Sequence, residues 1–347
     1  MADYRITEVL PADKTTLAQV DTLLQQEGIR RDGNLDYICA MLDENGQVIG
    51  TGSCFGNTLR CFAVSREYQG EGLLNQIVTH LIEQQCARGN LHLFLYTKVQ
   101  SAKFFEDLGF CEITRVENRL VFMENRPDGF ARYLRGLAAA KTTGKSAAIV
   151  MNANPFTRGH QYLVEKAAAA CDTLHLFIVS EDASLVPFAV RKKLVAEGVK
   201  HLHNVVLHDS GPYIISNATF PSYFLKDEAA VIDGHARLDL AVFARIAGAL
   251  NITARYVGEE PASQVTGLYN EIMREQLPKA GIDCIVVPRK EANGKAISAS
   301  TVRQCLQSGD WDTLKALLPQ TSLDYFRSPE AAPVLERIRK AGNVVHY

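Results

Sequence analysis

Short apolar runs alternate with longer amphipathic segments in residues 1–124, a pattern that predicts strands alternating with helices. Strands are expected over residues 37–42, 48–54, 59–64 and 91–97. After the third run, one apolar stripe recurs at helical spacing: Leu74, Ile77, Val78, Leu81 and Ile82. A further helix is expected over 102–110, ending at Gly109, because glycine favours helix C-caps.

The alternation becomes more regular from residue 146 onward and predicts a parallel, doubly wound sheet. Strands are expected over residues 147–151, 174–179, 205–207, 254–257 and 284–287. Residues 210–239 lack a regular pattern and contain aromatics, so an irregular insertion is expected there, with a helix from 240 to 250. Residues 125–145 are turn-rich and polar. We therefore expect α/β domains over 1–124 and 146–347, joined by a linker over 125–145.

Composition narrows the class of protein. Hydrophobic residues make up 47% and charged residues 22% of the 347 residues, as in globular proteins. The net charge of −2 gives no sign of a nucleic-acid partner. The eight cysteines are scattered without a CxxC pair, which favours reduced thiols in a cytoplasmic protein. No signal segment or membrane-spanning run is present, and no histidine has metal-ligand spacing that would predict a metal site.

Residues 152–160 connect the first strand of the second half to the helix that follows it. Such strand-to-helix turns bind ligands in open α/β sheets, and a helix N-terminus suits phosphate. Thr157 and His160 are three residues apart and can face one ligand, while Gly159 lets backbone approach that ligand closely. Alone, the pattern fits equally well a capped helix with an exposed histidine.

A second segment, residues 297–303, also opens a predicted helix after the last strand. Ser298 or Ser300 can cap that helix, and its first turn carries Thr301 and Arg303. Hydroxyls, free N–H groups and a guanidinium then point the same way and form another phosphate site. The alternative is a capped surface helix with a solvated arginine.

Together and in this order, the two segments resemble the (H/T)-x-G-H and I-S-x-(S/T)-x-x-R signatures of the nucleotidylyltransferase superfamily. The resemblance implies a Rossmann-like domain that binds ATP with Mg2+ bridging phosphate oxygens, and that transfers AMP with release of pyrophosphate. We expect Thr157 and His160 to hold the α- and β-phosphates, and Arg303 to hold the β- and γ-phosphates. The other expected ATP contacts are Asn152, Asn154, Phe156, Gly159, Gly258, Glu259, Ser298, Ser300 and Thr301.

For several neighbouring residues, the sequence supports two interpretations. Gly258 and Glu259 follow a late strand and either reach the adenosine or form a solvated strand-end loop. Tyr269 and Asn270 either line the same pocket or pack a helix. In the run 191–193, one basic residue can contact phosphate, but at least two are expected on a solvated helix face, because consecutive residues splay around a helix.

The order of elements in residues 1–124 resembles the GNAT acetyltransferase fold, a mixed-sheet domain. Gln69, Gly70 and Gly72 lie where that family wraps the pyrophosphate of coenzyme A with backbone N–H groups. Leu74 departs from the usual Gly or Ala. Phe105 stands where many members carry a proton-donating Tyr, and a phenyl ring cannot donate a proton. We therefore favour a domain that binds a coenzyme A-like arm over an amine acetyltransferase; an ordinary glycine turn is the alternative.

Nearly the whole chain resembles the citrate (pro-3S)-lyase ligase family, on residues 154–160, 255–261, 265–270 and 297–303 together with the GNAT-like half. The resemblance implies that ATP and acetate form acetyl-adenylate. The acetyl group then passes to the thiol of the phosphoribosyl-dephospho-coenzyme A group on the acyl carrier subunit of citrate lyase, which activates the lyase. One alternative is an adenylyltransferase that makes NAD or dephospho-coenzyme A. Another is a domain that binds a nucleotide only as a regulator.

Overall fold

The computed structural model describes residues 4–214, 220, 228–259 and 264–341. These residues form two compact units. The first unit runs to Ala131 and includes the start of helix α7 up to Gly234, and the second contains the rest. Each unit packs helices against its own sheet, which confirms the predicted α/β class. Among the described residues, no helix combines the length and apolar character needed to cross a membrane.

The described part of the first unit contains a seven-stranded sheet in the order β1-β2-β3-β4-β5-β7-β6. Neighbouring strands are antiparallel except β4 and β5, which are parallel, so the sheet is mixed as expected. β4 and β5 share only the register pairs Thr58↔Phe94 and Leu59↔Leu95 and then diverge. The strands are β1 (Arg5–Glu8), β2 (Tyr37–Leu42), β3 (Val48–Phe55), β4 (Thr58–Val64), β5 (Phe94–Thr97), β6 (Cys111–Val116) and β7 (Leu120–Glu124).

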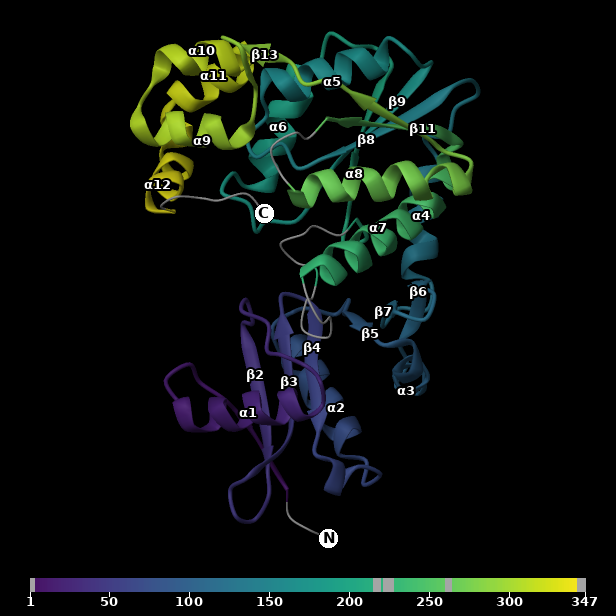
Figure 1. The fold of residues 1–347 in the computed structure, drawn as a ribbon, viewed down its shortest axis with the longest axis vertical. Helices are drawn as coiled ribbons and strands as arrows, with labels where there is room; N and C mark the ends of the chain where they lie inside the picture. The colour runs from purple at the N-terminus through teal and green to yellow at the C-terminus, as the bar shows by residue number, and fades with distance from the viewer. Residues whose placement is uncertain (1–3, 215–219, 221–227, 260–263, 342–347) are drawn as a thin grey trace. The chain divides into compact units, whose positions relative to one another are not determined.

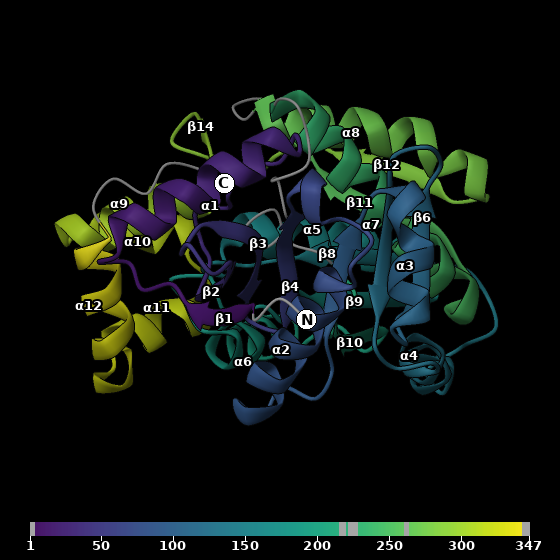
Figure 2. The ribbon, with the colours of Figure 1, turned by 90° about the horizontal axis from the view of Figure 1, so that it is seen from below.

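Two helices cover opposite sides of strands β2–β4, as Figure 2 shows: α1 (Lys14–Gln26) and α2 (Leu73–Ala87). Buried side chains of α1, such as Val20, form one core, and those of α2, such as Ile77, form the other. A Cβ at Gly52 of β3 would lie 2.6 Å from Ile77, so glycine allows α2 to pack closely on the sheet. The short helix α3 (Ala102–Asp107) precedes Gly109, whose φ of 89° suits glycine.

The second unit is built on a parallel five-stranded sheet in the order β10-β9-β8-β11-β12 among its described residues. The first strand, β8, lies at the centre, and the chain continues outward on one side and then on the other. The strand order therefore reverses between β8 and β11, and such switch points are where doubly wound sheets bind ligands. The strands are β8 (Ser146–Met151), β9 (Thr173–Ile178), β10 (Val205–Asp209), β11 (Ile252–Gly258) and β12 (Asp283–Val287).

Helices lie on both sides of this sheet. Figure 1 shows α5 (Arg158–Ala168) on one side, and α7 (Glu228–Leu250) and α8 (Gln264–Gln276) on the other. α6 (Phe188–Gly198) begins after Pro187, and α4 (Gly129–Ala138) spans part of the predicted linker. The expectation that the chain is irregular up to residue 239 is wrong, because α7 begins at Glu228. The buried side of this helix carries His235 and Asp239, and these polar residues interrupt the apolar periodicity that would have revealed it.

The C-terminal helices extend the core of the second unit beyond its sheet. Leu314, Phe326 and Val334 of this region are buried in the same cluster as β8 residues such as Ile149. A short hairpin of β13 (Glu291–Ala292) and β14 (Lys295–Ala296) precedes these helices. They are α9 (Ala299–Ser308), α10 (Trp311–Leu317), α11 (Gln320–Arg327) and α12 (Ala332–Lys340). The sequence analysis anticipated only α9. The short 3-10 segments are 66–68, 99–101, 278–280 and 329–331.

Candidate functional site

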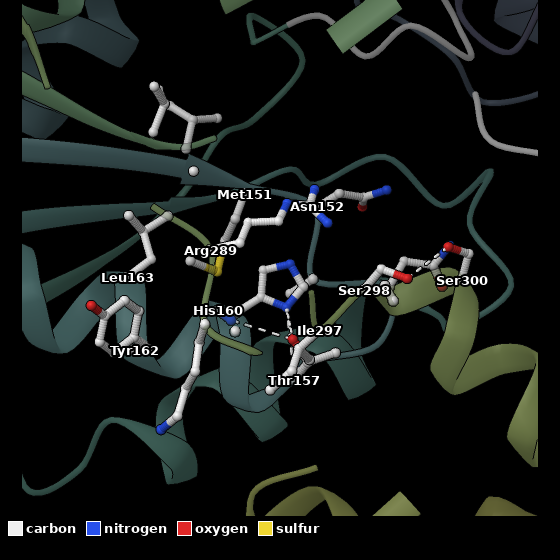
Figure 3. Close-up of a pocket in the computed structure, with 18 of the residues that line it drawn as sticks. Met151, Asn152, Thr157, His160, Tyr162, Leu163, Arg289, Ile297, Ser298 and Ser300 are labelled. Carbon is white, nitrogen blue, oxygen red and sulfur yellow. Dashed lines mark hydrogen bonds between the residues drawn. The ribbon is translucent and has the colours of Figure 1, made fainter. Parts of the chain in front are cut away.

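A cavity of about 700 Å³ opens at the carboxyl ends of β8 and β11, at the switch point of the parallel sheet. The two motif segments both line it, although they are far apart in the sequence. Figure 3 shows Thr157 and His160 from the start of α5 around the same cavity as Ser298 and Ser300 from the start of α9. Its lining includes nine of the predicted residues: Asn152, Asn154, Thr157, Gly159, His160, Gly258, Ser298, Ser300 and Arg303.

Thr157 and His160 form a reciprocal cap at the N-terminus of α5. The His160 N–H donates to Thr157 Oγ1 at 3.3 Å, and the Thr157 N–H donates to His160 Nδ1 at 3.1 Å. Histidine here takes the place that Glu or Gln usually holds in a capping box. Because Nδ1 accepts a hydrogen bond, the ring proton of the neutral histidine belongs on Nε2. The ring therefore offers a single N–H donor from a fixed position.

The charge state of His160 follows from its surroundings. The residue is partly buried, and its ring stacks on the fully buried ring of Phe156, with centroids 6.0 Å apart. Burial, reinforced by the positive charge of Arg289, lowers the pKa of His160 to about 4. Figure 3 shows Arg289 beside the imidazole. His160 is thus neutral at physiological pH and acts as a hydrogen-bond donor without a charge.

The second motif packs directly against the first. A Cβ at Gly159 would lie 3.3 Å from the Ile297 carbonyl oxygen, so the absence of a side chain permits this close approach. The β13–β14 hairpin turns at Asn293 and Gly294, with φ of 53° and 72°, as in a type I′ turn. The Ile297 N–H donates to the Lys290 carbonyl at 2.9 Å, which closes the base of the hairpin. The hairpin thereby sets the position at which α9 begins.

Ser298 caps α9 by accepting the Thr301 N–H at 3.1 Å, which decides between the two predicted caps. One turn later, Arg303 donates from Nη1 to the Asn154 carbonyl at 2.7 Å and ties the two motifs together. Arg303 is buried, its Nε has no partner, and no carboxylate among the described residues pairs with it. Burial lowers its pKa, yet a guanidinium remains charged. This buried cation is thus suited to an anionic ligand.

Three predicted ATP contacts do not line the cavity. Phe156 is fully buried in the core and supports the His160 ring from behind. Glu259 is exposed, and only its backbone is engaged, accepting from Arg289 Nε at 2.7 Å. The Thr301 hydroxyl lies 2.8 Å from Ser298 Oγ. Among the lining residues, Asn154 also uses its side-chain oxygen structurally, accepting the Val186 N–H at 3.0 Å.

The cavity contains cations that the sequence analysis did not single out: Arg255, Arg289 and Lys290. Arg289 and Lys290 come directly after Val287, the end of the last parallel strand, and Pro288, which is a recognisable place for ligand contacts. Arg255 interrupts an otherwise apolar strand, a signal that was also visible in the sequence. Tyr269 and Asn270 do line the cavity, and Asn270 Nδ2 donates to the Gly258 carbonyl at 3.1 Å.

Arg191 supports the site without entering it. Its guanidinium is fully buried and donates to the carbonyls of Asn152 at 2.9 Å, Val179 at 2.7 Å and Val186 at 3.0 Å, and also to Glu181. Arg191 therefore fixes the chain where β8 and β9 end. Lys192 and Lys193 are exposed and form ion pairs at the surface, as expected for a solvated face.

Among the described residues, no carboxylate lines the cavity and no group of three or more metal-ligating side chains occurs. The described lining thus does not present a protein site for Mg2+, which prefers oxygen ligands. The cavity offers cations and hydrogen-bond donors. A divalent ion fits this chemistry as part of a metal–nucleotide substrate.

The glycine loop of the first unit begins α2. Gly72 is its N-cap with φ of 76°, and Gly70 has φ of 92°, values that favour glycine. The Gln69 side chain donates to the Val64 carbonyl at 3.1 Å and holds the loop to the end of β4. Phe105, in place of a proton-donating tyrosine, is buried against Phe62 and Phe110.

Comparison with known proteins assigns both halves to families. Residues 5–110 match the acetyltransferase (GNAT) family, and residues 146–326 match the citrate lyase ligase C-terminal domain. The chain is thus a GNAT-type domain followed by a ligase-type domain with a parallel sheet.

Full-length relatives define the family further. The chain is 40% identical to the citrate (pro-3S)-lyase ligase of Klebsiella pneumoniae, over 90% of this chain and 93% of that protein. It is 36% identical to the ligases of the same name from Haemophilus influenzae, over 92% and 98%, and Escherichia coli K12, over 93% and 93%. The chain belongs to the citrate (pro-3S)-lyase ligase family and is a ligase, which confirms the resemblance drawn from the sequence.

Proposed function

We propose that this ligase uses ATP to adenylylate acetate and transfers the acetyl group to the thiol of the phosphoribosyl-dephospho-coenzyme A group on the acyl carrier subunit of citrate lyase. The overall reaction releases AMP and pyrophosphate and activates the lyase. The observation that carries the proposal is the meeting of two capped helix starts, α5 and α9, at one cavity lined by Arg289, Lys290 and Arg303. Unpaired N–H groups at helix starts, together with guanidinium and ammonium groups, suit a triphosphate.

In the first step, negative charge develops on phosphate oxygens beside the N–H groups and cations of the cavity. A carboxylate oxygen attacks the α-phosphorus, and the bond from that phosphorus to the oxygen bridging to the β-phosphate breaks. Negative charge grows on pyrophosphate as it leaves. The neutral His160 donates its Nε2 proton in a hydrogen bond to a phosphate oxygen, and Arg303 neutralises charge on the β- and γ-phosphates. Positioning and charge neutralisation account for most catalysis in such transfers, so no nucleophilic side chain is required.

In the second step a thiolate attacks the acyl carbon, and AMP leaves with the electrons of the broken bond. The first unit supplies a place for the arm that carries the thiol. β4 and β5 diverge after two register pairs, and the loop with Gln69, Gly70 and Gly72 follows β4 and begins α2. Such a loop can bind a pyrophosphate with its backbone N–H groups. The buried Phe105 does not supply a proton, which agrees with an arm-binding role.

Acetate-dependent exchange of labelled pyrophosphate into ATP tests the first step by itself, because that step needs no thiol. We expect exchange with acetate alone and acetyl transfer only when the acyl carrier subunit is added. Exchange supported only by nicotinamide mononucleotide or phosphopantetheine would replace the ligase with a cofactor adenylyltransferase. ATP binding without exchange under any of these conditions would leave a regulatory nucleotide site.

A further inference from the structure

Arg255 of β11 is a buried cation in the cavity that has no role in the phosphate contacts described above. It is 5% exposed and lines the same cavity as His160 and Arg303. Its Nε and Nη1 atoms are buried without a hydrogen-bond partner. A buried guanidinium with unused N–H groups costs free energy, so its presence beside a ligand cavity indicates a partner that the ligand supplies.

The position of Arg255 is fixed by α7 and α8. Its Cζ atom lies 4.3 Å from the centre of the Phe243 ring. Asp239 Oδ2 is 3.8 Å from Nη1, which balances charge but is too long for a hydrogen bond. The Tyr269 hydroxyl donates to that same oxygen. Burial and the Asp239 charge raise the pKa of Tyr269 well above its ordinary value, so this hydroxyl stays a donor.

Arg255 is separated from the phosphate contacts along the sheet. It lies three residues before Gly258, the end of β11, and therefore about 10 Å along the strand from the edge at which the cavity opens. Its side chain points to the α7–α8 side of the sheet, because its guanidinium stacks on Phe243. Val257 and Val150 lie two residues nearer this edge than Arg255 and its register partner Ala148, and together with Met273 they give the cavity an apolar wall. The surroundings thus combine one cation with space for a short alkyl group.

We propose that Arg255 binds the carboxylate of the acid that is adenylylated, and that Asp239 and Tyr269 position its guanidinium. This inference rests on the proposed function. Guanidinium groups pair with carboxylates through charge-assisted hydrogen bonds, and the unused N–H groups of Arg255 meet this need. Adenylylation brings this carboxylate to the α-phosphate, and the helix starts at the sheet edge hold the β- and γ-phosphates.

The test compares Michaelis constants in the exchange reaction for the full-length protein and the variants Arg255→Lys and Arg255→Met. We expect the KM for acetate to rise about 10- to 100-fold in Arg255→Met and less in Arg255→Lys, as for loss of a charge-assisted hydrogen bond. The KM for ATP should change less than about twofold. Arg274→Met, which removes an exposed arginine of α8, is the matched control and should change neither constant. Equal rises for acetate and ATP, or no rise for acetate, would overturn the inference.

Tyr269→Phe keeps the test decisive if the Arg255 variants fold poorly. It removes only the hydroxyl that holds Asp239, so the KM for acetate should rise about threefold or more while kcat changes little. An unchanged acetate constant in that variant would contradict the positioning role. If the wild-type protein shows no acetate-dependent exchange, the proposed function fails by itself. In that case, NMR measures the binding of labelled acetate to wild type and to Arg255→Met in the presence of a non-hydrolysable ATP analogue. Weaker binding to Arg255→Met than to wild type supports the inference, and equal binding refutes it.

Discussion

His160 caps α5, and we propose that it also donates a hydrogen bond to a phosphate oxygen; two substitutions test these roles. His160→Gln retains an acceptor for the Thr157 N–H, because glutamine is an ordinary partner in a capping box. His160→Ala removes that acceptor and should lower the free energy of unfolding by about 1 kcal/mol. The alanine variant also lacks the Nε2 donor, whereas the glutamine amide keeps an N–H donor beside its acceptor oxygen. Loss of one such donor typically lowers kcat by about 100- to 1000-fold, so we expect this loss in His160→Ala and a much smaller one in His160→Gln.

The depressed pKa of His160 also makes stability depend on pH. The unfolded chain binds a proton on this residue near pH 6.5, whereas the folded chain does so only near pH 4. Between these values the unfolded state holds more protons, so the free energy of unfolding falls as the pH falls. The interval corresponds to about 3 kcal/mol, an upper value because the ring is partly exposed. His160→Gln lacks this dependence, so its stability relative to wild type should improve from pH 7 to pH 4.

Urea unfolding of wild type and His160→Gln at several pH values between 4 and 7 measures this difference directly. In the same pH range, the exchange activity of wild type should not fall with a midpoint near pH 6.5. Wild type and His160→Gln should therefore not differ in this respect. Stability curves that stay parallel across this range would refute the depressed pKa. An activity midpoint near pH 6.5 that disappears in His160→Gln would show a histidine that titrates in solution, and the neutral-donor mechanism would be wrong.

Other parts of the chain give sharper structural tests. Arg191→Met leaves several buried carbonyls without a donor and should lower the free energy of unfolding by about 3 kcal/mol in urea, whereas the exposed Lys192→Met should change it by less than about 0.5 kcal/mol. Gly198→Ala places a Cβ 2.3 Å from the Phe156 ring and should cost about 1–3 kcal/mol by calorimetry; an unchanged transition would contradict that packing. Gly72→Val, at φ of 76°, should reduce acetyl transfer to the carrier while acetate-dependent exchange persists, and equal loss of both would count against separate roles.

Periodicity and turn chemistry were sufficient to predict most of the architecture. The parallel strands, the helix caps at Thr157 and Ser298, and the glycine end after α3 each depend on short-range patterns. The beginning of α7 was missed because its buried side carries His235 and Asp239, whose partners come from elsewhere in the fold. Short-range sequence patterns do not show which polar residues are buried against residues from other elements.

The lining of the cavity was predictable where a motif met a helix start and unpredictable where a residue contacts distant segments. Arg191 was read as one of three adjacent basic residues, yet it reaches carbonyls on several segments. Phe156 lies within the first motif but is buried in the core of the second unit. Arg255 was visible as a charge within a strand, but only packing against Phe243 reveals that it is buried. The roles of Arg191, Phe156 and Arg255 therefore depend on contacts between residues that are far apart in the sequence.

Although the protein has a net charge of −2, its cavity collects positive charge that suits the polyanionic substrate proposed above. Arg255, Arg289, Lys290 and Arg303 line it, and no carboxylate does so among the described residues. Before a ligand binds, these cations repel one another, and Arg289 disfavours a proton on His160. A triphosphate held by Arg289, Lys290 and Arg303 should relieve part of this repulsion, so binding should both stabilise the fold and weaken with salt. At a ligand concentration of about 100 times Kd, the gain is about 2.7 kcal/mol, which a thermal unfolding series at two ionic strengths can resolve.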